Sequence, residues 1–146
     1  MVLRRLSLAL GLALALGAGT ALSADKPYSE GTVWTMSLIK VKPGMFDVYM
    51  RDLLPIRKKL DEEAKKEGLV LSTHILSGQA SGNDDFDFVI LEEFKNWAAF
   101  DGLTAKYDTL MDKLGQTEEK QTQAMEKRVE VRSIIGMKTF QEIVPK

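Results

Sequence analysis

The sequence predicts a single α+β domain in which helices cover one face of a four-stranded antiparallel sheet. Four segments contain alternating apolar residues and are rich in Val, Ile and Thr, which is typical of strands. Two longer segments carry apolar residues every three or four positions, which indicates amphipathic helices. The 146-residue chain contains no Cys, so its hydrophobic core must stabilise the domain without disulfides.

The first predicted strand and the first predicted helix follow each other directly. Residues 32–42 alternate and end at a Pro-Gly pair, which predicts a strand. From Met45 onward apolar residues recur at helical spacing until Gly68 closes the helix. Pro55 removes one backbone hydrogen bond, but the apolar stripe continues in phase, so we expect a kink and not a break. Charged residues fill the opposite side, which predicts a solvated helix face: Arg57, Lys58, Lys59, Asp61, Glu62, Glu63, Lys65 and Lys66.

Residues 69–76 and 86–94 predict the two strands of an antiparallel hairpin, because only the short polar turn 77–85 lies between them. At this turn oxygen-bearing side chains alternate as they do at the start of a calcium loop: Asn83, Asp85 and Asp87. The sixth and twelfth positions of the loop, however, hold Phe88 and Phe94 instead of Gly and Glu. We therefore expect a solvated turn that binds no metal.

The C-terminal part predicts a second helix, a shorter third one and the last strand. Asn96 is the expected cap of the second helix, which ends at Gly115 and carries an apolar stripe: Phe100, Leu103, Tyr107, Leu110 or Met111, and Leu114. A shorter helical stretch covers 118–127. Residues 128–143 predict a long strand in which Gly136 marks a bend or a bulge.

The resulting order, β-α-β-β-α-β, predicts the ferredoxin-like or split βαβ sandwich, a four-stranded antiparallel sheet with two helices on one face. The other face of the sheet stays half apolar, and we assign these residues to it: Val33, Ile39, Val41 and Val89. A second copy of the chain is the simplest cover for such a face. The sequence therefore predicts a homodimer.

The first 24 residues have the order of a secretory signal peptide. Arg4 and Arg5 give a positive start, an apolar Leu- and Ala-rich run follows, and small residues precede the first acidic residue. Because this run is shorter than the roughly 20 residues that span a bilayer, a cleaved signal is favoured over a membrane anchor. We expect cleavage after Ala24, with Ala21 and Ser23 as the alternatives.

Cleavage would leave residues 25–146 as one domain that works outside the cytoplasm, either periplasmic or secreted. Removal of the signal takes away two arginines and no acidic residue, which changes the formal net charge from −1 to −3. A negatively charged domain gives no support for binding to nucleic acids or to anionic membranes. We therefore expect no nucleic-acid partner, and no membrane association after cleavage.

Short motifs occur where the predicted elements begin and end: Val41-Lys42-Pro43-Gly44, Gly68, Glu92-Glu93-Phe94 and Ala99-Phe100. With these motifs the chain resembles the dimeric α/β-barrel superfamily, and within it the antibiotic-biosynthesis-monooxygenase-like group. That group includes cofactor-independent oxygenases of polycyclic aromatics and haem-degrading enzymes. The haem-degrading members use a His on a helix, whereas the second helix here carries none, and Phe94 stands where their Trp is usual. Both departures argue against haem degradation.

The resemblance implies a ligand cavity between the sheet and the helices. We assign four residues to it as candidate ligand contacts: Trp34, Met36, Trp97 and Phe100. His74, the only His, and Tyr107 are the candidate catalytic proton handlers. The alternatives are ordinary core packing for the aromatic residues and a structural or dimer-facing position for His74. With one His, no Cys and no glycine-rich phosphate loop, we expect neither a metal nor another cofactor.

Three functions agree with the sequence. The first is a non-catalytic exported protein that binds a small apolar or aromatic molecule. The second is a cofactor-independent monooxygenase that acts on an aromatic substrate, and the third is a purely structural or interaction dimer. A cavity of several hundred cubic ångströms with a polar group in it would favour the first two over the third. A His74 that reaches the cavity would favour the enzyme over the binder.

Overall fold

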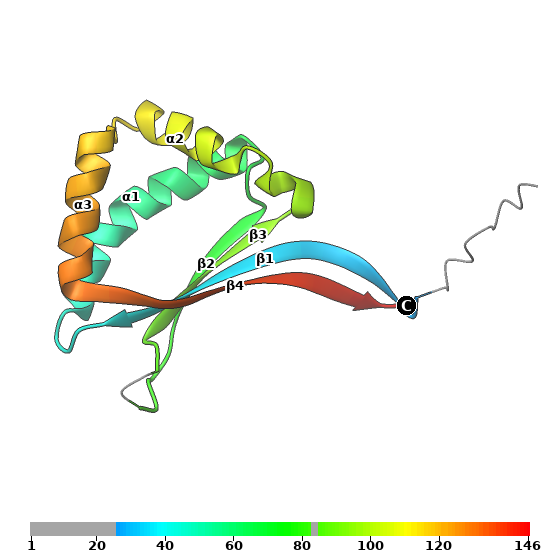
Figure 1. The fold of residues 1–146 in the computed structure, drawn as a ribbon, viewed down its shortest axis with the longest axis horizontal. Coiled ribbons are helices and arrows are strands. Elements are labelled where there is room, and N and C mark those ends of the chain that lie inside the picture. The colour runs from blue at the N-terminus through cyan, green and yellow to red at the C-terminus, as the bar shows by residue number, and fades with distance from the viewer. Residues whose placement is uncertain (1–25, 83–84) are drawn as a thin grey trace, which may run out of the picture.

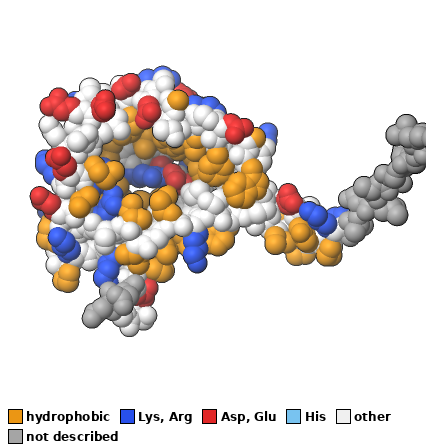
Figure 2. Space-filling view, in the orientation of Figure 1, with side chains coloured by type: hydrophobic (Ala, Val, Ile, Leu, Met, Phe, Trp, Pro, Cys, Tyr) orange, Lys and Arg blue, Asp and Glu red, His pale blue; other side chains and the backbone are white. Residues whose placement is uncertain are grey.

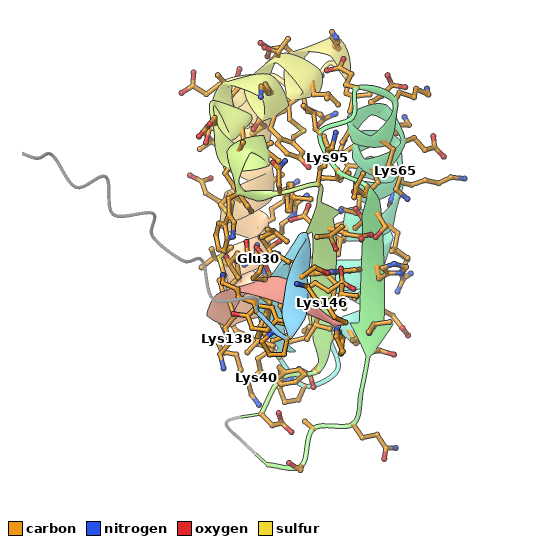
Figure 3. The ribbon with its side chains drawn as sticks, turned by 90° about the vertical axis from the view of Figure 1, so that its right-hand side faces the viewer. Glu30, Lys40, Lys65, Lys95, Lys138 and Lys146 are labelled. Carbon is orange, nitrogen blue, oxygen red and sulfur yellow. The ribbon has the colours of Figure 1, made fainter. Side chains whose placement is uncertain are left out.

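The computed structural model describes residues 26–82 and 85–146, so the predicted signal peptide lies outside the described residues. Four antiparallel strands form one sheet in the order β2-β3-β1-β4 (Figure 3): β1 (Tyr28–Val41), β2 (Ser72–Ser77), β3 (Phe88–Phe94) and β4 (Arg132–Pro145). The helices all lie on one side of this sheet (Figure 1): α1 (Phe46–Lys66), the 3₁₀ helix η1 (Trp97–Phe100), α2 (Leu103–Lys113) and α3 (Glu118–Val131). This confirms the predicted α+β, ferredoxin-like fold.

The second predicted helix is divided in two. The 3₁₀ helix η1 ends before Gly102, whose φ of 64° is a left-handed conformation that favours glycine, and α2 begins only after it. Asn96 precedes η1, but its side chain makes no capping hydrogen bond. Trp97 and Phe100 therefore lie on η1, whereas Tyr107 lies on α2.

The third helix is longer than the predicted stretch, and it makes three helices on one face of the sheet instead of two. Thr117 caps α3, since its hydroxyl oxygen accepts a hydrogen bond from the backbone N–H of Lys120. The strand β4 consequently starts four residues later than predicted. The register between β1 and β4 shifts next to Gly136, which confirms the predicted bulge.

The two faces of β1 are reversed relative to the sequence-based assignment. Val33, Ile39 and Val41 are buried beneath the helices and not on the uncovered face. Trp34 and Met36 point away from the helices, because successive side chains of a strand lie on opposite faces. The expectation that Trp34 and Met36 lie between the sheet and the helices was therefore wrong.

The face of the sheet away from the helices, here called the outer face, carries a set of apolar and aromatic side chains. Strand register places these residues on it: Trp34, Met36, Leu38, His74, Leu76, Val89, Leu91 and Phe140. Val89 lies on this face, as predicted. No helix of the described chain covers the outer face (Figure 1).

The core between sheet and helices consists of two separate clusters of buried side chains. The first cluster joins β1 and β3 to the N-terminal half of α1: Ile39, Val41, Tyr49, Leu53, Phe88 and Ile90. The second cluster lies at the other end of the sheet and includes Val33, Ala64, Val70 and Phe94, with Phe100 and Tyr107 packed against it. The helix α1 runs without interruption through Pro55 and connects the two clusters.

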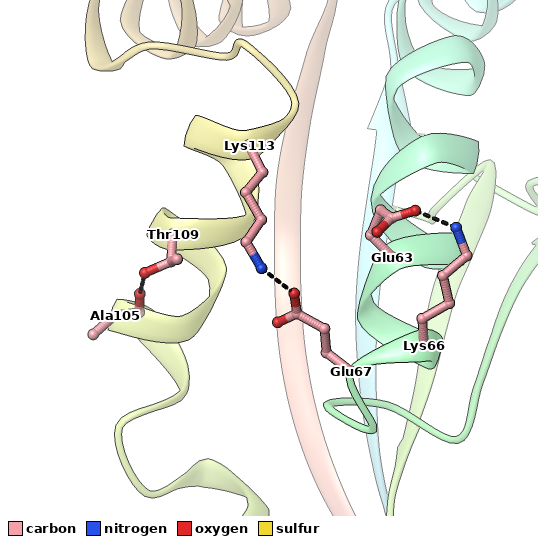
Figure 4. A network of polar contacts seen from close by, with 6 residues as sticks. All are labelled: Glu63, Lys66, Glu67, Ala105, Thr109 and Lys113. Carbon is pink, nitrogen blue, oxygen red and sulfur yellow. Dashed lines mark hydrogen bonds and ion pairs between the residues drawn. The ribbon is translucent and has the colours of Figure 1, made fainter.

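Polar contacts join the helices to one another near the second cluster. Lys113 of α2 forms an ion pair with Glu67, which follows the C-terminus of α1 (Figure 4). Within α1 itself, Lys66 pairs with Glu63 (Figure 4). These ion pairs are exposed to solvent, so we expect them to add little to the stability of the fold.

Candidate functional site

A row of polar side chains crosses the helix-facing side of the sheet between the two core clusters. One residue from each strand contributes to it, in the order β2, β3, β1, β4: Thr73, Glu92, Thr35 and Thr139. The residues are direct register partners, so their side chains lie side by side on the same face. The middle of the layer between sheet and helices is therefore polar where a closed core would be apolar.

Arg57 of α1 reaches this polar row and forms an ion-pair network with it. Its Nη2 donates a hydrogen bond to Oε1 of Glu92 over 2.6 Å, and its Nε lies 2.8 Å from Oδ1 of Asp61 one turn along the helix. The side chains of Arg57, Asp61 and Glu92 are only 15%, 20% and 23% exposed. Thr35 Oγ1 donates a further, longer hydrogen bond to Glu92 Oε2 over 3.3 Å. The prediction that Arg57 and Asp61 lie on a solvated helix face was wrong.

Burial and the charges of this network together shift the pKa values of Arg57 and Tyr107. Burial by itself would lower the pKa of the Arg57 guanidinium, but Glu92 and then Asp61 outweigh burial and raise it. Burial is also the main cause that raises the pKa of Tyr107 to about 12, and the charge of Glu92 adds to it. The Tyr107 hydroxyl is therefore protonated at neutral pH and can donate or accept a hydrogen bond there.

The molecule is hollowed between the sheet and the helices. Figure 2 shows hydrophobic side chains around the opening and basic and acidic side chains at its floor. Ile134 and Met137 of β4 point to the helix side of the sheet, yet they are 46% and 69% exposed. The helices therefore leave this part of β4 uncovered. A groove of about 480 Å³ between α1 and β2 opens on the other edge of the layer. Arg57, Asp61 and Thr73 are among the residues that line it.

The structure brings some of the predicted site residues together and separates others from the hollow. Tyr107 lies near the ion-pair network, and Phe100 packs against Phe94 in the second core cluster. Trp97 contacts Phe100 but is largely exposed on η1. His74 lies on the outer face, where its ring stacks on Trp34 with 6.3 Å between the ring centroids. His74 therefore does not reach the hollow.

Sequence reasoning missed Arg57, Glu92 and the three threonines of the polar row. The pairing of Arg57 with Glu92 joins residues 35 positions apart, and no local pattern predicts such a contact. One signal was available: the helix-facing residues of β1 change from Val33 to Thr35 and back to Ile39. A polar interruption of this kind inside a buried stripe indicates a functional site more often than a packed core.

The acidic residues near the β2–β3 turn have structural roles. Ser81 donates two hydrogen bonds to Oδ2 of Asp85, from its backbone N over 2.8 Å and from its hydroxyl over 2.9 Å. The backbone N–H groups of Ser81 and Phe86 are the main cause that lowers the pKa of Asp85. Asp87 accepts a hydrogen bond of 2.6 Å from the backbone N of Val41. Asn83 lies outside the described residues.

Two further properties concern metals and membranes. In residues 26–82 and 85–146, no three or more His, Cys, Asp or Glu side chains are grouped so that they could hold a metal ion. None of the helices in the same residues is long and apolar enough to cross a membrane.

Comparisons with known proteins bear on the fold. No protein-family model matches the sequence, and a search of curated proteins found no match. Among solved structures, protein SO0527 from Shewanella oneidensis is 14% identical, with a TM-score of 0.50 over 80% of this chain and 96% of that one. HapK from Hahella chejuensis is 14% identical, with a TM-score of 0.40 over 75% and 91% of the two chains.

A third similar structure is a Bacteroides fragilis protein described as dimeric, of unknown function and with a ferredoxin-like fold. It is 15% identical, with a TM-score of 0.36 over 77% of this chain and 95% of that one. At such low identity, the likeness to the Shewanella protein concerns the fold alone. The chain thus has an α+β ferredoxin-like fold, and its resemblance to the antibiotic-biosynthesis-monooxygenase-like group stays a prediction.

Proposed function

We propose that the mature protein is an exported homodimer that binds a small apolar or aromatic molecule between the sheet and the helices, without catalysis. The observation that carries this proposal is the polar row and its ion-pair network, which lie in the layer between the sheet and the helices and border the groove between α1 and β2. Ligand sites in proteins are typically concave and apolar, with a few polar groups that orient the ligand. The hollow has this composition.

The polar row also favours a binding site over a structural core on energetic grounds. Hydroxyl and carboxylate groups inside a domain lower the free energy of unfolding unless hydrogen bonds compensate for the lost water. Thr73 Oγ1 is buried and has no hydrogen-bond partner within the described residues. Apolar side chains at this position of the row would fill the layer at a lower cost, so the polar residues are better explained by a ligand than by packing.

The properties of the two candidate proton handlers, His74 and Tyr107, favour a binding protein over an enzyme. His74 lies on the far side of the sheet from the hollow. Tyr107 is near the network, but with a pKa of about 12 its hydroxyl would be a poor general base at neutral pH. Neither of the two residues selected from the sequence as proton handlers therefore supports the monooxygenase alternative.

The proposed dimer rests on the outer face. Its apolar side chains belong mainly to the two central strands, and the flanking strands add Leu76 and Phe140, both exposed. Glu93 and Lys138 also lie on this face, but most of its central side chains are apolar. Such a face is typical of a protein–protein interface, and a second copy of the same chain presents the same face to it. His74 would then lie in the dimer interface beside Trp34.

The binding site is tested by titrating the protein with N-phenyl-1-naphthylamine, an uncharged aromatic probe whose fluorescence rises in apolar surroundings. We expect saturable binding, and we expect Tyr107→Ala to weaken it by about 1–3 kcal/mol through lost contact area. The matched control is Trp34→Ala, which removes an aromatic ring from the outer face and should leave the affinity unchanged. If no uncharged aromatic probe binds to the wild-type protein, the structural-dimer interpretation replaces this proposal.

Export is tested on the native protein. Mass spectrometry of material from cells that express the full gene should give a mature N-terminus close to Asp25, because the signal peptide is removed during secretion. An intact N-terminal Met1 in the cytoplasmic fraction would contradict export and would leave the binding site as proposed.

A further inference from the structure

Resting on the proposed function, we infer that the hollow selects apolar ligands that carry a cationic amine over ligands of the same shape that carry a carboxylate. The groups that carry this inference are Arg57, Asp61 and Glu92, together with the hydroxyl groups of the polar row. Apolar walls alone would not determine the charge of the polar group that the ligand carries.

The charges of the ion-pair network beside the groove between α1 and β2 sum to a negative value. Two carboxylates, Asp61 and Glu92, face one guanidinium, that of Arg57, so the three side chains together carry a formal charge of −1. Arg57 is already engaged by both carboxylates, at 2.6 Å and 2.8 Å. An anionic ligand would therefore have to compete with them for the guanidinium and would be repelled by both.

The hydrogen-bonding groups of the polar row favour a donor on the ligand. A carboxylate oxygen accepts more than one hydrogen bond, and within the described residues Glu92 Oε2 receives only the long one from Thr35. An ammonium group has three donors and no acceptor, which matches the free lone pairs of this oxygen. Thr73 Oγ1 borders the groove between α1 and β2 without a partner among the described residues, and its hydroxyl can accept a hydrogen bond from such a donor.

The other titratable groups around the site do not make its charge positive. Tyr107 of α2 is neutral at physiological pH. Lys58, Glu62 and Lys65 of α1 also line the groove and together add a formal charge of +1, but all three are exposed, so solvent and salt screen their charges. The partly buried carboxylates therefore have the larger influence on a ligand that enters the layer.

The experiment compares three probes of nearly equal size by isothermal titration calorimetry near pH 7: 2-naphthylmethylamine, 2-naphthylmethanol and 2-naphthoate. They carry a positive charge, no charge and a negative charge. We expect the amine to bind at least tenfold more tightly than the carboxylate, because a charge close to a partly buried carboxylate experiences a strong Coulomb interaction. The alcohol should fall between the two.

Two variants test whether the network is the cause. Glu92→Gln should reduce the amine-to-carboxylate ratio to about twofold or less, and Asp61→Asn should reduce it as well if Glu92→Gln does not fold. The matched control is Glu93→Gln, which removes the same charge from the neighbouring residue on the outer face and should leave the ratio unchanged.

The possible outcomes separate this inference from the proposed function. If all three probes bind with similar affinity, or if the carboxylate binds best, the hollow binds apolar molecules but the inferred selectivity is overturned. If none of the probes binds, the proposed function fails and the inference fails with it. A preference for the amine that persists in both Glu92→Gln and Asp61→Asn also overturns the assignment to this network.

Discussion

Replacing Arg57 with Leu is expected to lower the free energy of unfolding by about 3 kcal/mol. The substitution leaves Asp61 and Glu92 largely buried without their cation, and an uncompensated charge in such a place is among the most destabilising changes in a protein. Urea unfolding followed by circular dichroism measures this loss.

The control for this prediction is Arg51→Leu, the same change on an exposed arginine of α1. It should alter the free energy of unfolding by no more than about 0.5 kcal/mol. A loss below about 1 kcal/mol in Arg57→Leu would mean that the network is too well solvated to stabilise the fold. The ion-pair network would then lack the strong local field on which the inferred ligand selectivity depends.

Placing a charge on the outer face is expected to convert the protein from a dimer to a monomer. Met36 lies on the outer face of β1, a central strand of the sheet. In Met36→Glu, two copies of the carboxylate would be buried in the interface, and pairing with Lys138, the register partner of Met36 on β4, would offset only part of the cost of removing both carboxylates from water. We expect the dissociation constant of the dimer to rise at least about a hundredfold, which corresponds to a loss of about 2.7 kcal/mol of binding free energy at such a central position.

Sedimentation equilibrium measures this change directly. The matched control is Val48→Glu, which makes the same kind of substitution on an exposed apolar residue of α1, away from the sheet. It should sediment as a dimer like the wild-type protein. A wild-type protein that is monomeric at high micromolar concentration, or a Met36→Glu variant that dimerises normally, would contradict the assignment of the outer face.

The order and type of the elements could be predicted from the sequence because each depends on local patterns. The helical spacing of α1, the hairpin of β2 and β3, and the bulge at Gly136 are all confirmed by the structure. The interruption between η1 and α2 was missed, because it depends on the left-handed conformation of Gly102 inside a stripe that otherwise looks continuous.

The phase of β1 could not be predicted in the same way. Its even residues include Trp34 and Met36, and its odd residues include Val33 and Ile39, so either face could have been the core. The pairing with β3 decides the matter, since Phe88 and Phe94 are fully or almost fully buried opposite the odd residues. Such pairings join residues far apart in the chain and are absent from any short window of sequence.

The same limit explains why only part of the candidate site was found. Tyr107 was selected because an aromatic residue on the apolar side of a helix points into the layer below it. Arg57 belongs to a run of charged residues whose other members are mostly exposed, and only its contacts with Glu92 and Asp61 distinguish it. Its role follows from three-dimensional contacts and not from the composition of α1.

The central claim, that a small apolar molecule binds between the sheet and the helices, is tested most directly by methyl-detected NMR with N-phenyl-1-naphthylamine. Met137 and Thr139 face the helix side, whereas Met36 and Leu38 lie on the outer face of the same sheet. We predict that the methyl signals of Met137 and Thr139 shift in a saturable manner while those of Met36 and Leu38 do not. Shifts confined to Met36 and Leu38, or no shifts at any of the four, would contradict the account.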